Sequence, residues 1–254
     1  MKKTFLLLAV LLSVTTSFAQ KKSMDQYIDD LMAKMTLDEK VGQLNLLPGG
    51  DITTGAGMNS PLAALIQKGE LGSVLNVMGV DKAKALQELA VKKSRLGIPL
   101  LIGQDVIHGY ETIFPIPLAQ GCSWDPQAVE LGARVAAKEA SADGVNWVYS
   151  PMVDVAHDPR WGRVSEGYGE DPYLSGVMGA AAVRGYQNGE YPVAACLKHY
   201  ALYGATEAGK DYSSVDMSRL RMYNQYLPPY KAAVDAGVWS VMSSFNLVDG
   251  VPAT

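Results

Sequence analysis

The sequence predicts an α/β fold built on a parallel sheet, and three observations predict it. Short apolar runs alternate with segments of helical periodicity along most of the 254 residues. The apolar runs are continuous, as in strands that are covered on both faces. Five such runs occur before Thr254, whereas a closed (β/α)8 barrel needs about eight strands. We therefore expect a (β/α)8-like barrel that is incomplete in this chain, with a five-stranded doubly wound sheet as the alternative.

The first residues indicate an export signal that is not part of the fold. Lys2 and Lys3 precede an apolar run (residues 5–14), and small residues lead to Ala19. This pattern is typical of a secretory signal peptide (residues 1–19), cleaved after Ala19 and directing the mature domain (residues 20–254) to the periplasm or the exterior. The apolar run is too short to span a bilayer, so a membrane is not an expected partner.

Composition excludes several classes of function. Lys plus Arg is 22 and Asp plus Glu is 26, a formal net charge of −4, and the sequence has no basic stripe of the kind that binds nucleic acid. Two cysteines, Cys122 and Cys196, are too few for a disulfide scaffold, and we expect both to be small buried side chains. The histidine and cysteine spacings indicate no metal site, and no cofactor is expected. The oligomeric state stays open.

Helical signals open the mature chain. Apolar residues recur at helical spacing between Tyr27 and Met35, and Thr36 with Glu39 forms a capping box that begins a second helix. A glycine-rich stretch (residues 48–57) lacks the Lys-Ser or Lys-Thr ending of a phosphate-binding loop, so a surface loop is expected there.

Further along, helices begin at a capping residue followed by proline and end at glycine. On this basis helices are expected at residues 60–69, 81–96 and 125–144, with one beginning at residue 171 and one ending at residue 237. Between them, strands are expected at residues 72–77, 99–104, 145–150, 193–197 and 238–243.

Polar side chains gather where these strands end. In parallel α/β folds the functional residues lie at the carboxyl ends of strands. All three histidines of the chain fall in these positions. The candidates, strand by strand, are Asp105 and His108; Asp154, His157, Arg160, Trp161 and Arg163; Lys198, His199 and Tyr200; and the stretch from Met242 to Asn246.

Most of these candidates also have a structural interpretation. Asp105 can cap a turn, and His108 and His157 are expected to bond to the backbone. At least one of Arg160 and Arg163 is expected to form a fork onto a nearby carboxylate, the candidates being Glu166, Glu170 and Asp171. Trp161 either covers the core or offers its ring to a sugar. Lys198 follows a buried apolar run and needs a partner.

These residue types suit a ligand with many hydroxyl groups, although a phosphorylated substrate would also suit the cations. Three alternatives stay open. Lys198 could form a Schiff base, as in aldolases. The three histidines could hold a catalytic metal, although their spacing does not favour it. The domain could also be a sugar-binding module without catalysis.

Several blocks of sequence resemble one family. IGQDVIHG, VYSPMVDVAHDPRWGRVSEGYGEDPYL, LKHYALYG, GKDYSSVDMS, YLPPYKAAVDAG and VMSSFNLVDGVPAT occur in order along the mature chain. They are similar to family 3 glycoside hydrolases, specifically exported bacterial β-glucosidases. The resemblance implies a (β/α)8-like first domain followed by an α/β sandwich. It also implies exo-acting hydrolysis of terminal non-reducing β-D-glucosyl residues with retention of configuration, or a β-xylosidase or other family 3 specificity.

The resemblance also implies roles for individual residues. Asp105 would hold two hydroxyls of the terminal sugar, and Arg163, Lys198 and His199 would bind others. Met242 would line the pocket together with Phe245, where the family usually has Tyr. The loop at residues 201–216 contains no histidine, which argues against the N-acetylglucosaminidase branch. The nucleophilic Asp and the acid/base Glu are expected beyond Thr254, so we expect no catalytic residue and no metal ligand within this chain, and a fragment that is inactive alone.

Overall fold

The main sheet has six parallel strands arranged in the order in which they occur in the sequence, β1-β2-β3-β4-β5-β7. This is seen in a computed structural model that describes residues 23–49 and 62–254. A sequential order is that of a barrel wall. It excludes the doubly wound alternative, in which the strand order reverses at a switch point. The strands are β1 (Leu46–Pro48), β2 (Ser73–Leu75), β3 (Leu101–Gln104), β4 (Trp147–Val148), β5 (Ala194–Tyr200) and β7 (Ser240–Ser243).

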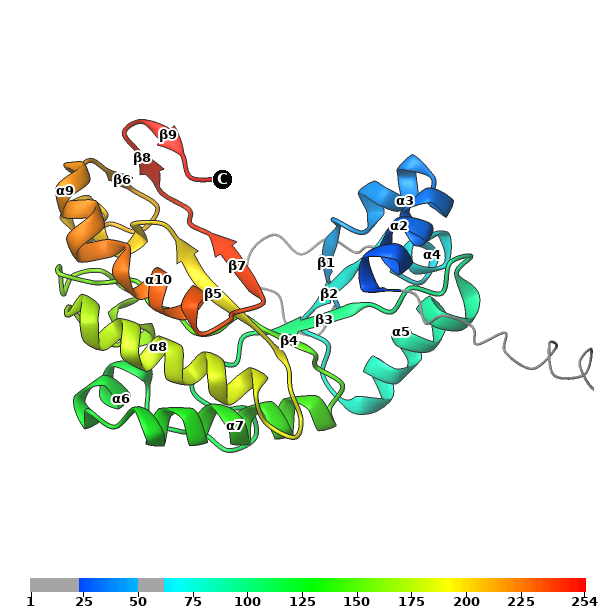
Figure 1. The fold of residues 1–254 in the computed structure, drawn as a ribbon, viewed down its shortest axis with the longest axis horizontal. Coiled ribbons are helices and arrows are strands. Elements are labelled where there is room, and N and C mark those ends of the chain that lie inside the picture. The colour runs from blue at the N-terminus through cyan, green and yellow to red at the C-terminus, as the bar shows by residue number, and fades with distance from the viewer. Residues whose placement is uncertain (1–22, 50–61) are drawn as a thin grey trace, which may run out of the picture.

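Helices cover the outer face of the sheet, with α7, α8 and α10 side by side (Figure 1). Four strands each contribute one residue to the core beneath the helices, and each of these residues is at most 1% exposed to solvent: Val74, Ile102, Val148 and Leu197. The helices are α2 (Met24–Lys34), α3 (Leu37–Gly42), α4 (Leu62–Lys68), α5 (Val80–Lys93), α6 (Pro117–Ser123), α7 (Pro126–Ala142), α8 (Pro172–Gln187), α9 (Arg219–Arg221) and α10 (Pro228–Asp235).

The sheet curls so that side chains on its inner, concave face contact one another. Trp147 and Tyr149 meet edge to face, with ring centroids 4.9 Å apart. The Trp147 Nε1 donates to Ser240 Oγ at 2.8 Å, which joins β4 to β7 across the intervening β5. Gly103 on β3 leaves room for Tyr149, because a Cβ there would lie 2.0 Å from the tyrosine oxygen. Such contacts across the concave face are those of a barrel interior.

A second, small sheet lies beyond the ends of β5 and β7 (Figure 1). It contains β6 (Ser214–Val215), β8 (Leu247–Val248) and β9 (Val251–Pro252), in the order β6-β8-β9. A separate apolar cluster supports it, formed by Val155, Leu202, Val215 and Tyr226. The sequence analysis did not predict this sheet, since its two-residue strands, unlike β4, do not lie within a longer apolar run.

The predicted alternation of strands and helices is confirmed, with shorter strands. Asp125 and Asp171 cap α7 and α8, accepting the backbone N–H of Ala128 at 3.0 Å and of Leu174 at 2.6 Å. For the main sheet the prediction of five strands is wrong by one, because β1 does not lie within a longer apolar run as the other five strands do. The signal peptide and the predicted helix start at residues 60–61 lie outside the described residues.

Neither cysteine is bridged. Cys196 is buried on β5, as predicted. Cys122 is exposed, so its predicted burial is wrong: it lies in the last turn of α6, a short helix that the sequence analysis did not foresee.

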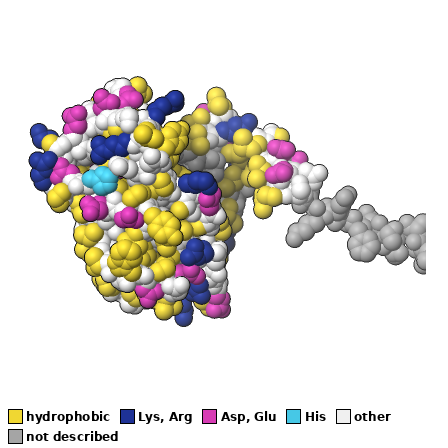
Figure 2. Space-filling view, turned by 60° about the vertical axis from the view of Figure 1, so that its left-hand side comes forward, with side chains coloured by type: hydrophobic (Ala, Val, Ile, Leu, Met, Phe, Trp, Pro, Cys, Tyr) yellow, Lys and Arg dark blue, Asp and Glu magenta, His cyan; other side chains and the backbone are white. Residues whose placement is uncertain are grey.

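The surface is mixed in charge. On the face shown in Figure 2, basic and acidic side chains are interspersed among hydrophobic ones. Within the described part of the chain, none of the helices has the length and apolar character needed to cross a membrane.

The N-terminal helices are joined through one carboxylate. Glu39 is buried; it accepts the Thr36 N–H at 2.8 Å and the Arg95 Nε–H at 3.0 Å. Arg95 follows α5 and also donates to the Lys34 carbonyl at 2.8 Å. Hydrogen bonds from Arg95, and then from the Thr36 backbone, lower the pKa of Glu39 to about 2.

We predict that Glu39→Gln lowers the thermal unfolding midpoint at pH 7, because glutamine keeps the cap but loses the charge paired with Arg95. Because the pKa of Glu39 is lower in the folded chain than in the unfolded chain, its ionised carboxylate stabilises the fold fully above the unfolded value near 4.5. This stabilisation is lost as the pH falls toward 2. The difference in unfolding midpoint between parent and variant, measured by circular dichroism, therefore narrows as the pH falls from about 4.5 toward 2. Glu88→Gln is the control, because Glu88 pairs with Lys92 on the exposed surface of α5 and joins no other helix through that pair. A gap that is constant from pH 7 to pH 3 would contradict the prediction.

Candidate functional site

Lys198 forms an ion pair across the sheet at the carboxyl ends of the strands. Its side chain is 4% exposed, and Nζ donates to Asp105 Oδ1 at 2.7 Å. Lys198 lies on β5 and Asp105 directly follows β3, so the contact crosses the end of β4. Asp105 keeps 57% of its side chain exposed. The predicted need of Lys198 for a partner is confirmed, and the carboxylate of that partner, Asp105, still faces solvent.

A second ion pair lies in the loop after β4. Arg163 donates from Nε and Nη2 to both oxygens of Glu166, at 2.7 and 2.8 Å. The predicted fork of an arginine onto Glu166 is therefore confirmed. Burial is the largest single influence on Glu166 and opposes its ionisation, but the Arg163 hydrogen bonds and the charges of Arg163, Lys198 and His199 together outweigh it. The pKa of Glu166 is consequently below its ordinary value.

A third pair is fully buried. His199 is 1% exposed, and its Nδ1 lies 2.8 Å from Oδ2 of Asp154, which is also 1% exposed. The same Oδ2 accepts the backbone N–H of His199 at 3.1 Å. Tyr230 of α10 closes the group from behind, with its hydroxyl 2.6 Å from Asp154 Oδ1 and 2.7 Å from the His199 carbonyl.

Aromatic rings surround the His199 imidazole. Tyr203 lies edge-on to it at 5.1 Å between centroids, and Phe245 lies at 5.4 Å. The Arg163 guanidinium is 5.5 Å from the Tyr203 ring, which places the second and third pairs against the same tyrosine. Tyr212 contacts Phe245 at 5.7 Å and is 66% exposed. The arrangement offers apolar ring surface next to charged hydrogen-bonding groups.

Four of the sequence candidates have structural roles. His108 and His157 are held by backbone carbonyls, of Phe114 at 2.9 Å and Glu170 at 3.1 Å, as predicted. Arg160 binds Asp158, two residues away, and is exposed. Trp161 is 2% exposed and donates from Nε1 to Asp211 at 3.0 Å, so it covers the core and does not offer its ring to a sugar.

The remaining predicted residues are brought to one end of the barrel wall. Met242 is half-buried on β7, which pairs with β5 up to the Tyr200–Ser243 register. Together with Asp105, Arg163, Lys198 and His199, it follows or ends neighbouring strands. Sequence reasoning missed the pairing of Asp154 with His199 and the positions of Tyr203, Tyr212 and Tyr230 beside them. Their spacing along the chain carries no signal for these contacts.

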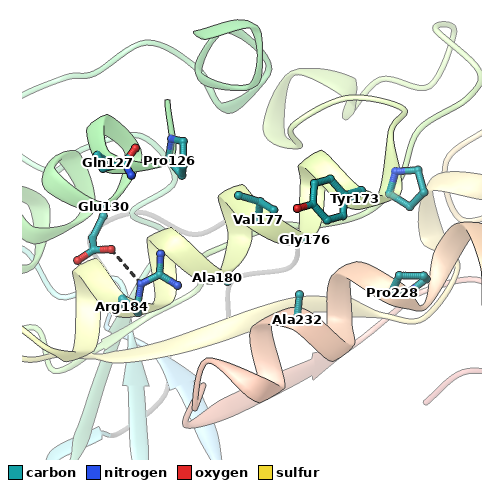
Figure 3. A pocket seen from close by; sticks show the side chains of 11 residues that line it. Pro126, Gln127, Glu130, Tyr173, Gly176, Val177, Ala180, Arg184, Pro228 and Ala232 are labelled. Atoms are coloured by element: carbon teal, nitrogen blue, oxygen red, sulfur yellow. Dashed lines mark hydrogen bonds and ion pairs between the residues drawn. The ribbon is translucent and has the colours of Figure 1, made fainter. Parts of the chain in front are cut away.

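A separate cavity lies on the outer side of the barrel wall. It has a volume of about 330 Å³ between α7, α8 and α10, and the Glu130–Arg184 ion pair (2.9 Å) closes one side of it (Figure 3). It shares no residue with the three pairs at the strand ends, which are Lys198–Asp105, Arg163–Glu166 and His199–Asp154. Across residues 23–49 and 62–254, no three His, Cys, Asp or Glu side chains are grouped so as to hold a metal ion.

Comparison with known proteins assigns a family. The model of the glycosyl hydrolase family 3 N-terminal domain matches residues 36–254. The chain belongs to glycoside hydrolase family 3. The periplasmic β-glucosidase of Salmonella typhimurium is 44% identical over 234 residues, which cover 91% of this chain and 30% of that protein. A β-xylosidase of Formosa agariphila is 34% identical over 278 residues, covering 99% of this chain and 33% of that protein.

Solved β-glucosidase structures superpose on the chain. The β-glucosidase of Listeria innocua in complex with isofagomine is 44% identical with a TM-score of 0.84, and its complex with glucose is 43% identical with a TM-score of 0.82. Each covers 91% of this chain, while the chain covers 33% and 34% of those structures. The chain thus spans about a third of the length of these family 3 relatives.

Removing Asp105 is expected to destabilise this family 3 domain more than removing Lys198. We predict that Asp105→Ala costs about 2–4 kcal/mol of unfolding free energy, because it leaves a buried ammonium without an anion. Lys198→Met costs less than about 1.5 kcal/mol, because Met fills the volume of the lysine stem and Asp105 is solvated by water. Urea denaturation measures both.

Lys231→Met is the control for this comparison. Lys231 pairs with Asp235 at the surface, with both side chains more than half exposed, so its loss changes stability by about 0.5 kcal/mol or less. An equal cost for Asp105→Ala and Lys198→Met would show that Lys198 does not depend on Asp105.

Proposed function

We propose that this chain forms the sugar-recognition part of an exo-acting retaining β-glucosidase that releases terminal non-reducing β-D-glucosyl residues. The observation that carries the proposal is the charge balance of the strand ends. Each cation there is hydrogen-bonded to a carboxylate: Lys198 to Asp105, and Arg163 to Glu166. The imidazole of His199 likewise faces Asp154.

A balanced set of pairs favours a neutral ligand with many hydroxyl groups. A sugar hydroxyl can donate to a carboxylate and accept from the adjacent cation, so it fits between them without adding charge. A phosphate group would have to displace the carboxylates from Lys198 and Arg163, which leaves buried or half-buried charges uncompensated. The rings of Tyr203 and Phe245 supply the apolar surface that a pyranose face requires.

Individual roles follow from exposure. Asp105 is the most accessible of the three carboxylates (57% exposed), so it is suited to accept hydrogen bonds from two sugar hydroxyls. Lys198 and Arg163 donate to others, His199 contacts the sugar through its ring nitrogen Nε2, and Met242 with Phe245 forms the wall. These roles are supported by the β-glucosidase names of the relatives, one of which, from Listeria innocua, has been crystallised with glucose.

The carboxylates close to these residues are unsuited to catalysis. Retaining hydrolysis needs two carboxyl groups about 5 Å apart, one of them a nucleophile and the other a proton donor. Asp154 is buried and engaged by His199 and Tyr230. Glu166 is clamped by Arg163 and has a lowered pKa, which is the wrong direction for a general acid. We therefore place the nucleophile and the acid/base beyond Thr254. We also propose export to the periplasm, on the signal pattern at residues 1–19.

The proposal predicts that the chain binds D-glucose without hydrolysing glucosides. In an NMR titration of the 254-residue chain, Lys198→Met weakens glucose binding by about tenfold or more, because a charged hydrogen-bond donor is lost. Lys231→Met leaves the affinity unchanged. Incubation with p-nitrophenyl β-D-glucoside gives no release of nitrophenol.

Other outcomes would favour the alternatives. Equal or tighter binding of D-xylose would favour a β-xylosidase, the name of the Formosa agariphila relative. Hydrolysis by this chain alone would overturn the placement of both carboxylates beyond Thr254. Borohydride trapping of a carbonyl compound on Lys198 would overturn the glycosidase proposal in favour of an aldolase.

A further inference from the structure

The buried group formed by Asp154, His199 and Tyr230 has a more specific role than closing the core. A carboxylate and an imidazole are costly to bury unless each finds partners. The two side chains are 0% and 1% exposed, and both carboxylate oxygens of Asp154 are engaged. One end of the imidazole is used, since Nδ1 faces Asp154. Among residues 23–49 and 62–254, no hydrogen bond reaches its other nitrogen, Nε2.

The contacts of Asp154 determine which nitrogen of the ring carries a proton. An ionised carboxylate accepts hydrogen bonds and cannot donate them. Asp154 Oδ2 lies 2.8 Å from Nδ1 of His199, so Nδ1 is the donor. The same oxygen accepts the backbone N–H of His199 at 3.1 Å, which fixes the ring relative to its own main chain. Nε2 is then the ring nitrogen left for a ligand.

Tyr230 holds Asp154 from the side opposite the ring. Its hydroxyl lies within hydrogen-bonding distance of Asp154 Oδ1 and of the His199 carbonyl. Burial, followed by the charge of Asp154, raises the pKa of Tyr230, so the phenol keeps its proton as a donor. Through this residue, helix α10 supports the carboxylate that orients the imidazole.

We propose that Asp154 is a positioning residue for sugar binding: it holds the His199 ring in one orientation, with Nδ1 protonated and Nε2 turned to the ligand. Asp154 does not touch the sugar, because both of its carboxylate oxygens are taken by His199 and Tyr230. The proposal rests on the proposed function in one respect only, namely that the ligand contacted by His199 is a sugar. The orientation of the ring itself is independent of that assignment.

Two substitutions separate positioning from charge. Asp154→Asn keeps the geometry, because the fixed N–H of the His199 backbone requires the amide oxygen to occupy the place of Oδ2. The amide NH₂ then donates to the Tyr230 hydroxyl, which in turn donates to the His199 carbonyl. Asp154→Ala removes all of these contacts and frees the ring. Val153→Ala is the matched control, because Val153 is 0% exposed and packs toward Gly179 of α8.

The experiment combines a glucose titration with ¹H–¹⁵N correlation spectra of the imidazoles in the full 254-residue chain. The chain has three histidines, so few signals need to be assigned. We expect Asp154→Ala to weaken D-glucose binding by about tenfold to a hundredfold and to abolish the protected Nδ1–H signal of His199. We expect Asp154→Asn to retain that signal and to bind within about threefold of the parent. Val153→Ala lowers the unfolding midpoint without changing either readout.

The outcomes distinguish this inference from the proposed function. If the parent binds glucose and Asp154→Ala binds equally well, the positioning role is wrong and the proposed function stands. If the parent binds no glucose, the proposed function fails, and the Nδ1–H signal decides the orientation of His199 by itself. Retention of that signal in Asp154→Ala would overturn the inference whatever the titration gives. Equal weakening by Val153→Ala and Asp154→Ala would also overturn it, because general destabilisation would then explain the loss.

Discussion

The buried ammonium of Lys198 is the constraint on which the rest of the site depends. The ammonium is almost completely shielded from water near the end of β5, so it requires an anionic partner. Asp105 supplies that anion from β3, two strands away. The contact is possible because the sheet curls over Trp147 and Tyr149 on its inner face. Flattening the sheet would separate the pair, so barrel curvature and charge compensation support each other.

The other polar groups follow the same rule at shorter range. Glu166 neutralises Arg163 within one turn of chain, and Asp154 faces His199 across the boundary between β4 and β5. Each cation is therefore compensated before a ligand arrives. A site of this kind recognises its ligand through the directions of hydrogen bonds and through ring contacts, since it has little net charge to offer. That is the pattern expected for a neutral sugar and not for a phosphate ester.

Local features were predictable from sequence, whereas contacts between distant segments were not. The strand ends carrying Asp105 and Lys198 follow from apolar runs, and the Arg163–Glu166 fork follows from a spacing of three residues. The pairing of Asp154 with His199 joins residues 45 positions apart, and that of Lys198 with Asp105 joins residues 93 apart. Those partners are decided by how far the sheet curls, which no local pattern encodes. β1 and the small sheet were missed because their two or three residues do not lie within a longer apolar run, as those of the equally short β2 and β4 do.

Binding and catalysis make opposite demands on carboxylates, and Asp154 and Glu166 meet only the first. A carboxylate that orients a cation or an imidazole is held by several donors, which stabilises its charged form. A nucleophile needs an accessible lone pair, and a general acid needs a raised pKa. Asp154 and Glu166 have the environment of the first kind. Asp105 has the exposure of a group that meets the ligand, but it is tied to Lys198. Since changing any one of these carboxylates would release a buried or half-buried partner, the two reacting carboxylates are best supplied by a segment outside this network.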